Sequence, residues 1–140
     1  MRKLIGLGLA TALATALFAV PASAQTVTKF SILGRQVSSH RVSSDTFAFR
    51  DRLLEPGNRS NVLGHDKGRC TLISRAAAHC RVVFSFANGK VKVNGTDRFR
   101  QHLSKVPVVG GTRAYNGVSG KSIVHHANHR DTLVDFTLVR

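Results

Sequence analysis

Hydrophobic side chains alternate with polar ones along almost the whole chain after residue 25. This period of two places every second side chain on the same face of an extended strand. The pattern is clear at residues 46–54, where Phe47, Phe49 and Asp51 share one face. No later segment shows the period of 3.6 residues that an amphipathic helix requires. The chain is therefore predicted to fold as an all-β protein.

Turn-forming residues divide this pattern into about eight strands at hairpin spacing. Pro56–Gly57 and Asn88–Gly89 are turn signals, since Gly and Asn adopt positive φ at low cost. The predicted strands are residues 27–37, 46–54, 62–73, 80–87, 90–94, 99–109, 118–127 and 132–139. The fifth strand is expected to end at the Asn94–Gly95 pair. Several short antiparallel strands in one small domain indicate either a β-sandwich or a β-barrel.

The first residues have the three parts of a secretory signal peptide. Arg2 and Lys3 precede an apolar run at residues 4–20, and residues 22–24 form an Ala-x-Ala cleavage pattern. We predict a cleavable signal-peptide helix at residues 1–24 and a single domain at residues 25–140. A transmembrane anchor is disfavoured, because the run is short and only mildly hydrophobic. The mature protein is then secreted or extracytoplasmic and has no membrane span.

Cys70 and Cys80 are the two cysteines of the chain. In an oxidising compartment, two cysteines that flank a turn are expected to form a disulfide. Closing so short a loop stabilises a fold by roughly 2–3 kcal/mol on chain-entropy grounds. A reactive thiol pair or a metal site is the alternative, but the spacing is not that of a CxxC motif. We therefore predict a structural disulfide.

The chain carries a formal net charge of +14, with 21 Lys and Arg residues against 7 Asp and Glu residues. Such a charge attracts polyanions, for example nucleic acid, lipopolysaccharide or acidic polysaccharides, in a salt-dependent way. The basic residues are spread singly rather than gathered in runs. The sequence therefore favours solubility or loose association with anionic cell-surface polymers, and it predicts no specific nucleic-acid binding.

Residues 108–120 predict two strands joined by a tight corner that holds Tyr115. Gly110–Gly111 and Asn116–Gly117 supply backbone freedom on either side of this ring. The segment resembles the GGTGxYxGxxG signature of the allene oxide cyclase and dirigent-like barrel superfamily, whose bacterial members are small secreted barrels. Arg113 stands where the signature has its third glycine, so the corner is expected to be less tight or displaced.

Two further segments resemble the same superfamily and keep its order. Residues 63–71 resemble a strand of pattern xGxDxGxCT, and residues 79–91 resemble a hairpin of pattern LCxxxFxLPxGQI. The resemblance covers residues 46–139. It implies a closed eight-stranded antiparallel β-barrel, and it leaves open whether the protein is a monomer or a homo-oligomer of up to three chains.

Relatives with this fold hold a reactive or hydrophobic molecule inside the barrel, and the resemblance implies the same here. The ligand-binding walls are then expected to be Phe47, Phe49, Phe84, Phe86 and Phe136. Asp51 and Tyr115 are candidates for polar or catalytic groups, because a buried carboxylate can act as a general acid or base. Three alternatives stay open: the rings fill a solid core, Asp51 pairs with an arginine at the barrel rim, and Tyr115 packs beneath the corner.

The histidine spacing does not indicate a metal site. His125 and His126 point to opposite faces of a strand, and His129 follows in the predicted turn. The sequence also lacks the GxSxG, P-loop, GxGxxG and HExxH motifs. No metal and no cofactor are predicted.

The sequence thus predicts a secreted barrel that binds a small hydrophobic molecule, either as an allene oxide cyclase-like isomerase or cyclase or as a dirigent-like guide of stereochemistry. Whether it is an enzyme stays open. The alternative is a non-catalytic protein that binds anionic cell-surface polymers through its basic exterior. A third is a solid barrel whose partner binds its rim loops.

Overall fold

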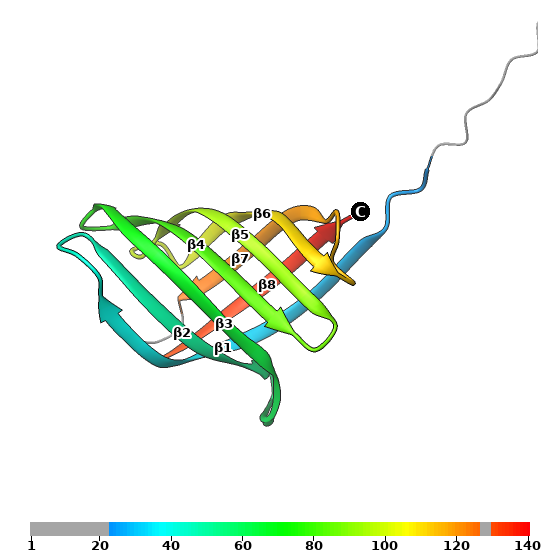
Figure 1. Cartoon of the computed structure of the whole chain (residues 1–140), viewed down its shortest axis with the longest axis horizontal. Helices are drawn as coiled ribbons and strands as arrows, with labels where there is room; N and C mark the ends of the chain where they lie inside the picture. Colours follow the sequence, from blue (N-terminus) through cyan, green and yellow to red (C-terminus); the bar gives the residue numbers. More distant parts are fainter. Residues whose placement is uncertain (1–22, 127–129) are drawn as a thin grey trace, which may run out of the picture.

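The computed structural model describes residues 23–126 and 130–140 (Figure 1). These ranges hold eight strands and no helix. The strands are β1 (Val27–Arg41), β2 (Thr46–Glu55), β3 (Asn58–Ser74), β4 (Ala77–Phe86), β5 (Gly89–Arg98), β6 (Leu103–Arg113), β7 (Ser119–His126) and β8 (Asp131–Val139). Almost all of the predicted signal peptide lies outside the described residues.

The strands form a closed antiparallel barrel in chain order. Each strand pairs with the next, and β8 pairs with β1 to close the cylinder. The predicted all-β fold, a closed eight-stranded antiparallel barrel, is therefore confirmed. Among the described residues, no helix is long and apolar enough to cross a membrane.

The fifth strand does not end where the sequence predicted. β5 continues through Asn94–Gly95 to Arg98, and Gly95 pairs with Cys80 of β4. A Cβ atom at position 95 would lie 2.8 Å from Cδ of Pro107, so a glycine fits because a strand packs closely there. Glycine after asparagine therefore marks a close approach here and not a turn. The turn comes later, at residues 99–102, which the sequence had assigned to a strand.

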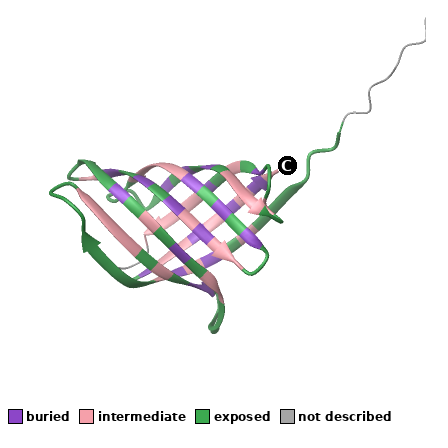
Figure 2. Ribbon diagram, in the orientation of Figure 1, coloured by how far each residue is buried: buried purple, intermediate pink, exposed green. Residues whose placement is uncertain are grey.

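Buried and exposed residues alternate along the strands, as Figure 2 shows. The buried side chains fill the middle of the barrel, where Ile32, Leu53 and Val91 are fully enclosed. Phe136 stacks on Phe30 and meets Phe84 edge to face, with both ring centroids 5.0 Å away. This aromatic centre separates the two ends of the barrel.

The corner at residues 114–117 joins β6 to β7 and holds Tyr115, as predicted. The Tyr115 ring lies against Phe30 and Phe86. A Cβ atom at Gly111 would lie 2.5 Å from the Tyr115 carbonyl oxygen, so a glycine is required there. That the corner is less tight or displaced at Arg113 stays a prediction, and the structure gives the backbone conformation of this residue. Arg113 adopts a φ of 53°, so the corner keeps a left-handed residue and a bulky side chain bears the strain.

Candidate functional site

A cavity of about 140 Å³ lies inside the barrel, toward the end with the β1–β2, β3–β4 and β5–β6 turns. Its aromatic walls are Phe47 and Phe49 from β2, Phe84 from β4 and Phe99 from the turn after β5. Valines of β4 to β8 complete the apolar lining: Val82, Val93, Val106, Val124 and Val134. An apolar cavity of about 150 Å³ can bind benzene, so this space suits a single ring.

Two carboxyl groups face this apolar space from neighbouring strands. Asp51 of β2 lies directly opposite Asp66 of β3 in the strand register, and both line the cavity. The backbone N–H of Asp51 donates a 3.1 Å hydrogen bond to Oδ1 of Asp66. Asp66 is 3% exposed. The barrel therefore holds two like-charged groups next to each other where water is scarce.

Burial raises the pKa of both carboxyl groups. Loss of solvation raises the pKa of Asp51 to about 6. Loss of solvation and, second, the negative charge of Asp51 raise the pKa of Asp66 to about 8, against the opposing effect of the Asp51 N–H. At neutral pH Asp66 therefore holds a proton and Asp51 is mostly ionised. An acid and a base lie side by side in one apolar cavity.

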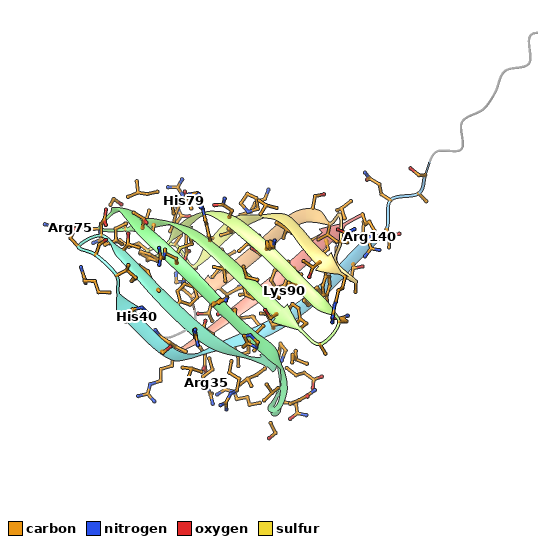
Figure 3. The ribbon with its side chains drawn as sticks, in the orientation of Figure 1. Arg35, His40, Arg75, His79, Lys90 and Arg140 are labelled. Atoms are coloured by element: carbon orange, nitrogen blue, oxygen red, sulfur yellow. A yellow bond between two sulfur atoms is a disulfide. The ribbon has the colours of Figure 1, made fainter. Side chains whose placement is uncertain are left out.

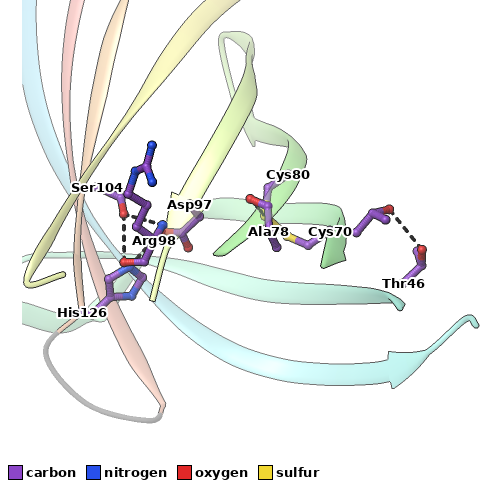
Figure 4. Close-up of a disulfide and its surroundings, with 9 residues drawn as sticks. Thr46, Cys70, Ala78, Cys80, Asp97, Arg98, Ser104 and His126 are labelled. Carbon is purple, nitrogen blue, oxygen red and sulfur yellow. Dashed lines mark hydrogen bonds and ion pairs between the residues drawn. A yellow bond between two sulfur atoms is a disulfide. The ribbon is translucent and has the colours of Figure 1, made fainter. Parts of the chain in front are cut away.

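A second polar pair lies at the same cavity. The His126 ring of β7 shares a 2.9 Å hydrogen bond with Asp97 of β5 (Figure 4). Phe99 meets the imidazole edge to face at 6.4 Å between ring centroids. The neighbouring His125 points outward and bonds to Asp135 at 2.7 Å. The two histidines thus lie on opposite faces of the strand, as predicted.

No protein-family model matches the sequence, and no curated protein sequence matches it. Solved structures do. A pterocarpan synthase dirigent protein gives a TM-score of 0.71 at 14% identity, over 91% of this chain and 97% of its own. For the Diels–Alderase AbnU the TM-score is 0.70 at 14% identity, over 84% of this chain and 100% of that protein. For pyocyanin demethylase the TM-score is 0.67 at 16% identity, over 79% of this chain and 99% of that protein.

The chain has the allene oxide cyclase/dirigent-like barrel fold. The resemblance found in the sequence is thereby confirmed for the fold. At these identities the likeness concerns the path of the backbone, so the site of this dirigent-like barrel has to be judged from its own side chains.

The dirigent-like barrel distributes the predicted wall residues over three places. Phe47, Phe49 and Phe84 line the cavity of the carboxyl pair. Phe136 is buried in the aromatic centre, 1% exposed. Phe86 lies beyond that centre, with its ring 5.8 Å from the rings of both Phe30 and Tyr115. The five predicted phenylalanines therefore do not form one wall.

The two predicted polar candidates also lie apart. Asp51 lines the lumen cavity, and no ion pair with an arginine is found for it among the described residues. Tyr115 lines a different cavity, of about 310 Å³, at the end of the barrel where the termini lie. Asp51 and Tyr115 thus line different cavities and cannot both contact the same small ligand.

The sequence reasoning did not single out Asp66 and Asp97. Asp66 is separated from Cys70 by four positions, so alternation alone would have put the two side chains on one face. Asp97 lies beyond the predicted end of the fifth strand, and that error hid its inward direction. Its partner His126 was considered as a metal ligand but not as half of a hydrogen-bonded pair.

The predicted disulfide is confirmed. Cys70 and Cys80 are bonded and lie directly opposite each other on β3 and β4, with Cα atoms 4.1 Å apart. Both are buried and line the lumen cavity (Figure 4). The bond ties together the two strands that carry Asp66 and Phe84. A disulfide is consistent with an extracytoplasmic location.

Within residues 23–126 and 130–140, no group of three or more His, Cys, Asp and Glu side chains is placed to hold a metal ion. His129, part of the predicted histidine cluster, lies outside the described residues. The described lumen holds the carboxyl pair, the His–Asp pair and the aromatic walls.

Proposed function

We propose that this dirigent-like barrel binds a small hydrophobic molecule in its lumen and guides the cyclisation or coupling of that molecule. The observation that carries the proposal is the Asp51–Asp66 pair facing the rings of Phe47, Phe49 and Phe84 in one cavity. Structural neighbours named as a Diels–Alderase and a dirigent protein support this class of reaction.

The cavity would hold one ring of the substrate, and its walls would fix how that ring is oriented. Orientation can supply most of the rate effect in reactions of this kind, because it removes the entropy cost of reaching the reactive geometry. A dry cavity also protects a reactive intermediate from water.

The carboxyl pair would move protons. Asp66 would donate its proton to an oxygen or nitrogen of the substrate while Asp51 removes a proton from a neighbouring carbon or hydroxyl group. The electron pair of the broken C–H or O–H bond forms the new bond, while the electron pair of a C=O or C=N π bond of the substrate moves to the atom that Asp66 protonates. A cyclisation by this step is an isomerisation that needs no oxidant. Transfer of the proton from Asp51 back to Asp66 restores the starting state.

A binding experiment with two matched variants tests the proposal. Indole binding is measured by calorimetry for the wild type, for Phe84→Trp and for Phe86→Trp, which adds the same volume outside the cavity. We expect saturable, salt-insensitive binding that Phe84→Trp weakens about tenfold or more, or ~1.4 kcal/mol, and that Phe86→Trp leaves nearly unchanged. Equal effects of both substitutions, or no binding by the wild type, would contradict lumen binding.

A further inference from the structure

The outer surface of β2 to β5 is strongly basic. Arg50 lies opposite Lys67 across β2 and β3, and Arg69 lies opposite Arg81 across β3 and β4. We call the following seven exposed residues the basic face: Arg50, Arg52, Lys67, Arg69, Arg81, Lys90 and Lys92. These strands form the wall toward the viewer in Figure 1, and Lys90 is labelled on it in Figure 3.

The aspartates of this wall do not lie on the basic face. The three aspartates of β2, β3 and β5 point into the lumen instead, where they line the cavity: Asp51, Asp66 and Asp97. Asp131 of β8 forms its ion pairs with Arg35 and Arg59, which lie outside the basic face. The alternation of the strands therefore puts these three carboxyl groups inside the wall and the cationic groups of the basic face outside it. Glu55, at the end of β2, is exposed and accepts a hydrogen bond from Asn61.

A groove of about 390 Å³ crosses the basic face over β1 to β4, with Ser38 and His40 as its lining from β1. Four cationic side chains of the basic face line it, namely Arg50, Lys67, Arg69 and Arg81. The outward-facing side chains of Ala48 and Val83 contribute apolar lining. Neighbouring strands lie about 4.8 Å apart, so these cations repel one another unless an anion lies between them.

We propose that the basic face is a binding site for an anionic polysaccharide, whose charged groups pair with these four cations. The apolar lining of the groove suits the C–H faces of sugar rings. A single-stranded nucleic acid would need exposed aromatic rings on which successive bases stack. Every outward-facing residue of β2, β4 and β5 is described, and none is Phe or Tyr. The proposal is independent of what the lumen binds.

The test compares two quadruple variants of equal net charge. One changes the groove, with Arg50→Gln, Lys67→Gln, Arg69→Gln and Arg81→Gln. The control changes four exposed cations elsewhere, with Lys29→Gln, Arg100→Gln, Lys105→Gln and Lys121→Gln. Both sets lie on the surface, and thermal melting checks that both variants fold. Binding is measured at physiological salt to heparin, to polygalacturonate, to neutral dextran and to single-stranded DNA.

We expect the wild type to bind heparin and polygalacturonate but not dextran. The groove variant should lose about tenfold or more of this affinity, and the control less than about threefold, because groove cations contact the polymer while the others act at a distance. Equal losses in both variants would overturn the proposal, since net charge alone would then explain binding. Tighter, groove-dependent binding of DNA, or no binding of either acidic polysaccharide, would also overturn it.

Discussion

Asp66 lies across the β2–β3 ladder from Asp51 and accepts a 3.1 Å hydrogen bond from its backbone N–H. The register of the two strands, and not the sequence distance of the residues, brings the carboxyl groups together. Each carboxyl group is poorly solvated, and the negative charge of Asp51 raises the pKa of Asp66 further. The pH dependence of the stability of the barrel should follow from this pair.

The free energy of unfolding should fall as the pH rises. The pKa of Asp66 is about 8 in the fold against 3.8 for a fully solvated aspartate, so the folded state binds more protons than the unfolded state between these values. Asp66 then costs the least stability below pH 3.8, and this cost grows as the pH rises toward 8. We expect a loss on the order of 1–3 kcal/mol between pH 5 and pH 8.5, measured by urea unfolding.

Asp66→Asn serves as the control for this pH dependence, because asparagine keeps the shape but does not titrate. The variant should show a flatter stability profile above pH 5. A wild-type profile that rises with pH over this range, or an unchanged profile in Asp66→Asn, would contradict the assignment.

Replacing Asp51 should change the titration of Asp66. In Asp51→Asn the nearby negative charge is gone, so the pKa of Asp66 should fall below its value of about 8. It should still stay above the ordinary aspartate range, since burial is the larger cause. Carboxyl chemical shifts followed by NMR over pH 4–10 measure this. A rise in the Asp66 pKa would refute the charge coupling.

Removing the disulfide should destabilise the barrel. In the double variant Cys70→Ala/Cys80→Ala the loop between β3 and β4 is no longer closed covalently, and we expect the free energy of unfolding to drop by roughly 2–3 kcal/mol. Thermal unfolding checks this, and it should show the variant melting lower than the oxidised wild type. Identical melting curves would mean that the β3–β4 ladder alone restrains this loop.

The corner should become more stable with a glycine at position 113. Arg113 has a φ of 53°, a conformation that costs a side chain with a Cβ roughly 1 kcal/mol and that glycine adopts freely. Arg113→Gly should therefore raise the free energy of unfolding by up to about 1 kcal/mol. Ala114→Gly is the matched control and should lower it, because position 114 has an ordinary φ. Chemical denaturation distinguishes the two, and a destabilised Arg113→Gly would show that the arginine side chain matters more than the backbone.

Alternation along each strand was enough to predict the all-β class and to put Phe47, Phe49 and Asp51 on one inward face. The two cysteines around a turn predicted the disulfide for a similarly local reason. The error at Asn94–Gly95 has the opposite origin. A glycine fits at position 95 because Pro107 of the adjacent strand packs closely there. A local sequence pattern does not show which residues of a neighbouring strand will lie next to it.

What the sequence by itself determined is the side of the sheet on which most residues of the predicted strands lie, because a regular strand has a period of two. Tertiary structure decided which inward-facing residues lie at the same height along the barrel axis. Strand tilt and register place Asp66 opposite Asp51, put Phe86 and Tyr115 beyond the aromatic centre, and gather scattered arginines into one groove. These are relations between strands, and hydrogen-bond pairing sets them only when the cylinder closes.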